Sequence, residues 1–406
     1  MNNKIAGESG LTIGERIEIH RRRRGLSRRA LANLVGRSEE WMRLVETGRQ
    51  QLDSVRMILR LAEVLRIDDY SELIEIARPP RRRSTDDAHA LMGAIEPTLI
   101  NHPDTAIGRG PALMYGSVGD LAAEVARCQS VWENSPVRFS TLAQRLPAVV
   151  VRLRADAPDR TVPELRIRAY HISCQLLRRI GAYNLAWVVA DRAAEDSLRG
   201  GCSILTAASA WHIAATLLDL GRFGACHDYA SAAAAVLSQD LPEPRDSAVL
   251  WGALHLLAAQ SATLDKDETA AQQSISRART AARALGNGGS CHGIRFDTNE
   301  INSAMMEVAL QGKDFGEIVR MAGQVEFPEH YPVAATARYH IVLAYGFAHI
   351  GEHLAATLAL DKAATACPEE LRFDYDAQRT LHHLIKHGGR KPRREVTRLA
   401  GLAHVR

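Results

Sequence analysis

The chain has 406 residues, of which 46% are hydrophobic and 24% are charged, and its formal net charge is +4. This composition is typical of a globular protein and excludes a disordered chain, and the length predicts two or more folding units. No apolar run approaches the roughly 20 residues that span a bilayer. The first ten residues, MNNKIAGESG, lack the hydrophobic core of a signal peptide. We therefore expect a cytoplasmic protein that does not enter a membrane.

Alanine and leucine are abundant, whereas β-branched runs and hairpin turn signals are scarce, so the chain is predicted to be all-α. The cysteines are scattered, with no C-x-x-C pair; they are Cys128, Cys174, Cys202, Cys226, Cys291 and Cys367. We interpret them as small buried side chains in a reducing compartment rather than as a disulfide framework.

Basic residues are concentrated at the N-terminal end. Residues 1–83 contain 18 Lys and Arg against 12 Asp and Glu, whereas the rest of the chain is close to neutral. A basic block on a near-neutral body indicates an end that binds a polyanion.

Five short helical patterns lie in this basic block; they are residues 13–24, 27–35, 38–48, 54–65 and 70–77. Thr12 and Glu15 fit a capping box before the first helix, and Ser27 and Ser38 are placed to cap the second and third. Gly36 supplies the left-handed turn between those two helices. Two short helices on either side of one glycine are typical of a helix-turn-helix.

The stretch IGERIEIHRRRRGLSRRALANLVGRSEEWMRLVETGRQ, followed by LRLAEVL, resembles the Cro/repressor (XRE) helix-turn-helix family. The shared marks are Gly-Leu-Ser before the second helix, Leu31-Ala32, Gly36, Ser38 and Glu46-x-Gly48. The resemblance implies a five-helix lambda-repressor-like domain over residues 11–78, with its third helix in the major groove of DNA. The family often has Gln in place of Arg28 and an apolar residue in place of Arg37, so the DNA sequence that is read does not carry over.

That placement implies seven candidate DNA-binding residues: Arg28, Arg29, Arg37, Ser38, Glu39, Glu40 and Arg43. The arginines early in the second helix are expected to meet phosphates, and those at the start of the third helix to meet base edges. The alternative for Glu39 and Glu40 is a role limited to capping the helix dipole.

Arg21 and Glu46 lie on the stripes of the first and third helices that are expected to be buried. Arg21 is four residues from Ile17, and Glu46 is four residues from Met42. Because a buried charge without a partner is costly, we expect Arg21 and Glu46 to pair. The family resemblance implies the same bridge.

The stretch ARPPRRRSTDD, from Ala77 to Asp87, has two prolines and a charge run, and it predicts a linker. We expect a DNA-binding domain over 11–78, a linker over 79–88 and a second domain over 89–406. The arginines of the linker either follow the DNA backbone or form a soluble hinge.

Five stretches of the second domain align with one another, each with an apolar helix end, a one-residue break and an alanine-rich helix. The breaks are Gly181, Gly221, Asp265, Gly312 and Gly351. This spacing is typical of a solenoid of helical hairpins. The units resemble degenerate tetratricopeptide (TPR) repeats, because Gly181-x-Tyr183 and Gly221-x-Phe223 match the turn of that family. Residues 121–132 and 139–153 predict one further hairpin, and the chain from Leu381 onward predicts a terminal cap.

The first helix of each hairpin is expected to line a concave groove. Alignment on the breaks, with neighbouring polar and aromatic positions, gives the candidate ligand-binding residues Arg168, His171, Gln175, Trp211, His255, Asn299, Asn302, Arg338 and Tyr345. Asn299 and Asn302 are three apart on one helix face, where their amides can bond a peptide backbone. The alternative is that these residues are ordinary surface polar groups or buried histidines with partners.

No motif supports catalysis. His349 and His353 lack a third metal ligand, Cys226-His227 and Cys291-His292 are only adjacent in sequence, and no phosphate-binding loop or nucleophile elbow is found. We expect neither an enzyme nor a bound cofactor or metal.

The architecture resembles that of the TPR-containing peptide-sensing regulators of Gram-positive bacteria. The resemblance implies a cytoplasmic transcriptional regulator, active as a homodimer on an inverted-repeat DNA operator. Its repeat domain would sense a peptide or a small diffusible metabolite and mediate dimerisation. The alternative is a protein-interaction adaptor whose repeats bind a partner protein.

Overall fold

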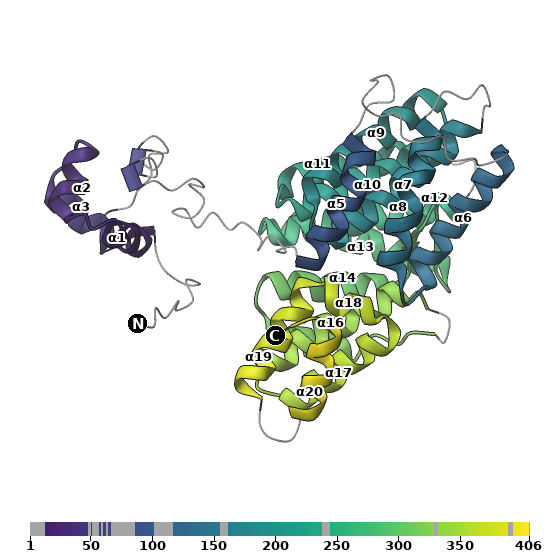
Figure 1. Ribbon diagram of the computed structural model, residues 1–406. Helices are drawn as coiled ribbons and strands as arrows, with labels where there is room; N and C mark the ends of the chain where they lie inside the picture. Colours follow the sequence, from purple (N-terminus) through teal and green to yellow (C-terminus); the bar gives the residue numbers. More distant parts are fainter. Residues whose placement is uncertain are drawn as a thin grey trace. The chain divides into compact units, whose positions relative to one another are not determined.

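A computed structural model describes residues 13–47, 50, 57, 60–61, 64–65, 86–100, 117–154, 161–237, 244–328, 331–388 and 393–405. The chain divides into two compact units, residues 1–78 and 79–406 (Figure 1). Apart from one two-stranded hairpin, every regular element in these residues is a helix, which confirms the all-α prediction.

The N-terminal unit contains α1 (Ile13–Arg23), α2 (Arg28–Leu34) and α3 (Glu39–Glu46), where the first three helices were predicted. Its core consists of Ile17, Leu31, Ala32, Val35, Met42, Val45, Leu61 and Leu65. The predicted helices over 54–65 and 70–77 fall largely or wholly outside the described residues, as does most of the predicted linker.

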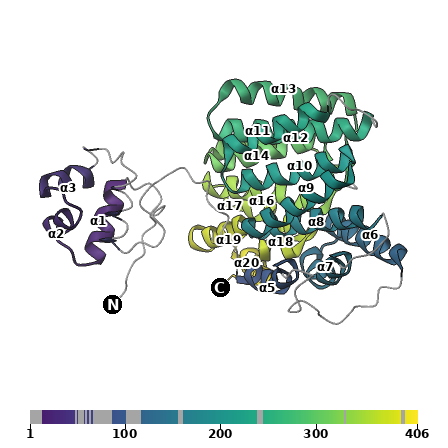
Figure 2. The ribbon, with the colours of Figure 1, turned by 90° about the horizontal axis from the view of Figure 1, so that it is seen from above.

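The second unit is a series of helical hairpins followed by short terminal helices. Its helices are α5 (Asp86–Ile100), α6 (Val118–Asn134), α7 (Arg138–Arg154), α8 (Val162–Arg179), α9 (Tyr183–Gly200), α10 (Ser203–Asp219), α11 (Phe223–Leu237), α12 (Pro244–Leu264), α13 (Glu268–Leu285), α14 (Thr298–Gln311), α15 (Phe315–Ala322), α16 (Val333–His349), α17 (His353–Ala366), α18 (Pro368–Phe373), α19 (Tyr375–His387) and α20 (Arg393–Leu402). Consecutive helices from α8 to α13 pack against one another, and Figure 2 shows them as successive layers. The predicted solenoid and the predicted hairpin at α6 and α7 are confirmed; α5 was not foreseen.

The turns of the five aligned hairpins correct the predicted register in two places. Gly181, Gly221 and Gly351 adopt the left-handed backbone conformation, as expected. In the other two hairpins a lysine adopts it, Lys266 with φ 64° and Lys313 with φ 59°, one residue after the predicted break. The alignment is therefore one residue off for α12 and α14, which corresponds to about 100° around a helix.

A short antiparallel hairpin, β1 (Gly289–Cys291) and β2 (Ile294–Phe296), is inserted between α13 and α14. Phe296 is fully buried and packs against α12 at Gly252, where a Cβ would overlap the phenyl ring. At the tip, a Cβ on Gly293 would overlap the side chain of Gln129 on α6. The hairpin thus connects α12 with α6.

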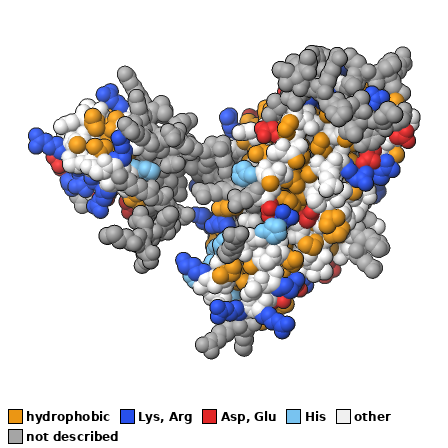
Figure 3. Space-filling model, viewed as in Figure 1, with side chains coloured by type: hydrophobic (Ala, Val, Ile, Leu, Met, Phe, Trp, Pro, Cys, Tyr) orange, Lys and Arg blue, Asp and Glu red, His pale blue; other side chains and the backbone are white. Residues whose placement is uncertain are grey.

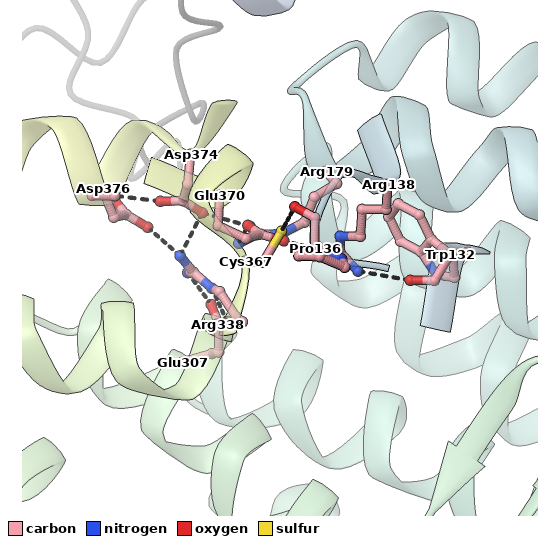
Figure 4. Close-up of polar contacts among 11 residues, drawn as sticks. Trp132, Pro136, Arg138, Arg179, Glu307, Arg338, Cys367, Glu370, Asp374 and Asp376 are labelled. Carbon is pink, nitrogen blue, oxygen red and sulfur yellow. Dashed lines mark hydrogen bonds and ion pairs between the residues drawn. The ribbon is translucent and has the colours of Figure 1, made fainter. Parts of the chain in front are cut away.

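Buried ion pairs join the C-terminal helices of the second unit to its first helices (Figure 4). Glu370 on α18 pairs with Arg138 on α7 and Arg179 on α8, and Arg179 also lies 2.6 Å from Asp374. Arg138 and Glu370 are 1% and 0% exposed. The backbone N–H of Phe139 at the start of α7 donates to Glu369 at 2.7 Å. The two ends of the solenoid are therefore in contact within this unit.

One helix corrects the expectation that no segment is apolar enough to span a membrane. Residues 245–264 of α12 pass that test by length and composition, with 72% of the window buried inside the fold. Such burial is typical of the core helix of a soluble protein. The cysteines are all free, and all but Cys202 are buried.

Candidate nucleic-acid interface

The turn between α2 and α3 is built by local hydrogen bonds that the sequence predicts. The Ser27 side chain accepts from the N–H of Ala30 at 3.0 Å, and that of Ser38 accepts from the N–H of Trp41 at 3.1 Å, so both helices are capped. Gly36 has φ 72° and reverses the chain between them. These caps fix the angle at which α3 leaves the turn.

The first helix holds α3 in place at its C-terminal end. Gly14 lies so close to α3 that a Cβ would overlap the carbonyl oxygen of Val45. Ile17 and Met42 are fully buried in the same core. The need for glycine at position 14 was not recognised from the sequence, although a small residue in a helix is a usual sign of close helix packing.

The predicted bridge between Arg21 and Glu46 is present. Arg21 Nε lies 2.6 Å from Glu46 Oε1, and NH1 of Arg21 also donates to the carbonyl of Leu26 at 2.8 Å. The two residues are 7% and 3% exposed. The bridge ties α1 to the end of α3.

Arg28 joins this bridge, which the sequence analysis did not foresee. Its Nε donates to Glu46 Oε2 at 2.6 Å, and the hydrogen bond to this carboxylate raises the pKa of Arg28. The Arg28 side chain stays 34% exposed. Arg28 therefore has a structural role, and its contact with phosphate stays a prediction.

The exposed face of α3 carries its own ion pair. Arg43 donates to both carboxylate oxygens of Glu40, at 2.8 and 2.6 Å, and this hydrogen bonding lowers the pKa of Glu40. At the turn, the Arg37 guanidinium lies 5.4 Å from the centre of the Trp41 ring. Arg43 must leave Glu40, or keep only one of its two bonds, to reach a base.

The remaining candidates surround the same turn. Arg29, Ser38 and Glu39 are exposed, and Asn33, Gly36, Arg37, Ser38 and Trp41 line an open depression beside the start of α3. Leu34 at the end of α2 is 52% exposed. The side of this unit in view in Figure 3 carries several basic side chains around a group of hydrophobic ones. Asn33, Leu34 and Trp41 extend the candidate set.

The candidate ligand-binding residues do not form one open set. His171 is 1% exposed, its Nε2 lies 2.9 Å from Ser209 Oγ, and its ring stacks on His212. Burial lowers the pKa of His171 to about 3 and that of His255 to about 4. Both are therefore neutral buried side chains, although Nδ1 of each ring has no hydrogen-bond partner in the described residues, so the alternative of buried histidines with partners is met only by Nε2 of His171.

Arg338 and Tyr345 also face their own chain. Arg338 pairs with Glu307, Asp374 and Asp376, and Tyr345 is 6% exposed and stacks on His349 at 4.1 Å. Arg338 is nevertheless partly exposed, as are Arg168, Gln175 and Trp211. The Nε2 of Gln175 is buried and has no hydrogen-bond partner in the described part of the chain.

Asn299 and Asn302 bind a peptide backbone, but that of their own chain. The amide of Asn299 donates to the carbonyl of Glu326 at 2.8 Å and accepts from its N–H at 3.4 Å. Asn302 donates to the carbonyl of Gln324 at 3.1 Å. The segment after α15 therefore occupies both amides.

The chain combines a capped helix-turn-helix in its N-terminal unit with helical repeats in its second unit. Residues 12–72 match the family model described as "Helix-turn-helix domain". Among solved structures, the chain is similar to the crystal structure of Bacillus thuringiensis PlcR in complex with the peptide PapR7 and DNA. The likeness covers 86% of this chain and 99% of that chain, at 11% identity and a TM-score of 0.33. None of the curated proteins compared with the chain matches it.

Proposed function

We propose that the chain is a DNA-binding transcriptional regulator. The observation that carries the proposal is the geometry of α2, the turn at Gly36 and α3, within the stretch that matches a helix-turn-helix domain. In domains of this kind the second helix of the pair lies in the major groove, and its first residues meet base edges. Arg37, Ser38 and Glu39 are exposed at that position here.

The contacts divide by chemistry. Arg29 and the partly exposed Arg28 lie at the start of α2, where such domains bind phosphate. Arg37, Glu40 and Arg43 are the candidates for base reading, since arginine bonds guanine and a carboxylate accepts from cytosine. The exposed Leu34 and the partly buried Trp41 offer apolar contact to a thymine methyl group or to sugar.

The repeat unit is the proposed sensor and dimerisation domain, in a cytoplasmic protein without catalytic activity. The signal is a peptide or a small metabolite that binds the concave side of the repeats, among Arg168, Gln175 and Trp211, which stay partly exposed. At Asn299 and Asn302 a peptide ligand has to replace the segment that now occupies their amides. A ligand acts on DNA affinity only through its different affinities for two shapes of the repeats.

Selection of bound duplexes from a random DNA pool by the full chain tests the proposal. We expect enrichment of an inverted repeat whose half-sites are about 34–36 Å apart or a multiple of this. Enrichment has to disappear for Arg37→Ala combined with Arg43→Ala. A pool that stays random for the unmodified chain contradicts sequence-specific regulation.

A further inference from the structure

A line of exposed apolar side chains runs along the outer face of α17. Leu354 and Leu358 are 57% and 56% exposed, and Ile350, just before the helix, is 45% exposed. Leu354 and Leu358 are four residues apart and therefore share one face of α17, whereas Ile350 ends α16 on the other side of the turn at Gly351. Single exposed leucines are ordinary, whereas a row on one helix is typical of an interaction surface.

Charges of opposite sign lie near the two ends of α17, with Lys362 in line with the two leucines and Glu352 at the N-cap. Glu352 precedes α17 and Lys362 lies ten residues later, about 15 Å along the helix. Both are exposed, and neither forms an ion pair with another described residue. The neighbouring Asp361 is paired with Arg398, so the charge of Lys362 is left for an external partner.

We propose that Ile350, Leu354 and Leu358, with Glu352 and Lys362 at the ends, form the surface that binds a second copy of this chain. We call it the α17 surface. A two-fold axis requires one patch to complement itself. Antiparallel packing of two α17 helices brings Leu354 against Leu358 of the second copy, and Glu352 near Lys362 of the second copy. The inference rests on the proposed function, because an inverted repeat is bound by two copies.

A second exposed apolar row lies on α11, where Tyr229 and Val236 are 40% and 62% exposed. Residues 223–237 contain the exposed Asp228 but no Lys or Arg. Arg222, just before α11, is exposed, but antiparallel packing of Tyr229 against Val236 of the second copy leaves Asp228 about 15 residues, or about 22 Å along the helix, from Arg222 of that copy. Of the two rows, only the one on α17 is complementary to itself in charge.

Sedimentation of the full chain tests the inference. We expect a dimer for the unmodified chain, and a dissociation constant raised on the order of a hundredfold or more by Leu354→Glu combined with Leu358→Glu. Val236→Glu, on the rival row, is the matched control and has to leave the dimer unchanged. A monomeric unmodified chain, or a dimer that only Val236→Glu dissociates, overturns the inference.

A charge exchange tests the antiparallel arrangement itself. Glu352→Lys should weaken the dimer by placing like charges at both ends, and Lys362→Glu added to it should restore the dimer. Absence of rescue overturns this arrangement. Binding of the full chain to a single half-site separates the two claims: a chain that fails to dimerise but binds the half-site contradicts the α17 surface and leaves the proposed DNA binding standing.

Discussion

Arg138 and Glu370 are 232 positions apart in the chain and form a buried ion pair that joins α7 to α18. Arg138 also donates to the carbonyl of Trp132 at 3.2 Å, and Glu370 is shared with Arg179. This relationship fixes the contact between the two ends of the solenoid. The ion pair joins helices far apart in the chain, so it cannot form within a single repeat.

Glu370→Ala should destabilise the second unit by about 3–5 kcal/mol, because it leaves the buried Arg138 without a carboxylate and Arg179 with Asp374 alone. Denaturant unfolding of the full chain measures the loss, and hydrogen exchange should rise in α7 and α18. Glu395→Ala is the control, since Glu395 pairs with Arg398 on the exposed surface, where solvent screens the charges and the pair contributes little to stability. Equal effects of the two changes would contradict the role given to Glu370.

Arg21→Ala should loosen the N-terminal unit and weaken binding to every DNA duplex, because Glu46 would keep only the more exposed Arg28. The expected cost is about 3 kcal/mol, at the lower end of the range for a broken buried pair. Hydrogen exchange over residues 13–47 of the full chain measures it. Arg22→Ala is the matched control, since the Arg22 side chain is 71% exposed. Unchanged exchange in Arg21→Ala would show that the bridge does not hold α3.

Arg29→Ala and Arg43→Ala should affect DNA binding differently. Arg29→Ala should weaken binding to all sequences and reduce the slope of log affinity against log salt by about one. Arg43→Ala should relax the preference at one base pair by roughly 1–3 kcal/mol. Binding to a set of duplexes at several salt concentrations separates the two. A uniform loss in both variants would remove Arg43 from base reading.

Glu300 should make the second unit less stable as pH rises towards neutral. Burial is the main cause that raises the pKa of Glu300 from 4.5 to about 7, and the negative charge of Asp297 acts in the same direction. The folded state therefore holds a proton that the unfolded state releases near pH 4.5. The stability from the protonated form is complete below that pH and is lost as pH rises through about 7.

Glu300→Gln removes this proton and keeps a neutral group near the hydroxyl of Tyr331, which lies 2.9 Å from Glu300 in the unmodified chain. Unfolding free energies of both chains between pH 4.5 and 7.5 test the prediction. As pH rises from 4.5 to 7.5, the unfolding free energy of the unmodified chain should fall relative to that of the Glu300→Gln variant. Parallel profiles would show that Glu300 is ionised in the folded chain.

The sequence predicted most of the described structure of the N-terminal unit, because helix caps and left-handed turns depend on neighbouring residues. Ser27, Ser38 and Gly36 predicted the helix-turn-helix in this way. The bridge between Arg21 and Glu46 followed from helix periodicity and the cost of a buried charge, together with the family resemblance. Arg28 was missed as a third member, because nothing in the sequence indicates which exposed arginine shares a carboxylate.

The concave side of the repeats could not be predicted in the same way. The spacing predicts breaks at Asp265 and Gly312, but Lys266 and Lys313 adopt the left-handed conformation there, which shifts the alignment by one residue. The Glu326 partner of Asn299 and the Asp374 partner of Arg338 come from segments outside the repeat pattern. Tertiary packing determines such long-range partners, and the periodicity of the sequence does not predict them.

The affinity for duplex DNA of the full chain and of its Arg37→Ala variant, measured at several salt concentrations, tests whether the chain reads DNA through α3. We expect the logarithm of the affinity to fall linearly with the logarithm of the salt concentration, as phosphate contacts require. We also expect Arg37→Ala to weaken binding to a selected operator more than to random DNA. Absence of binding at low salt, or binding that is indifferent to both salt and Arg37, would contradict the proposal that this chain reads DNA through α3.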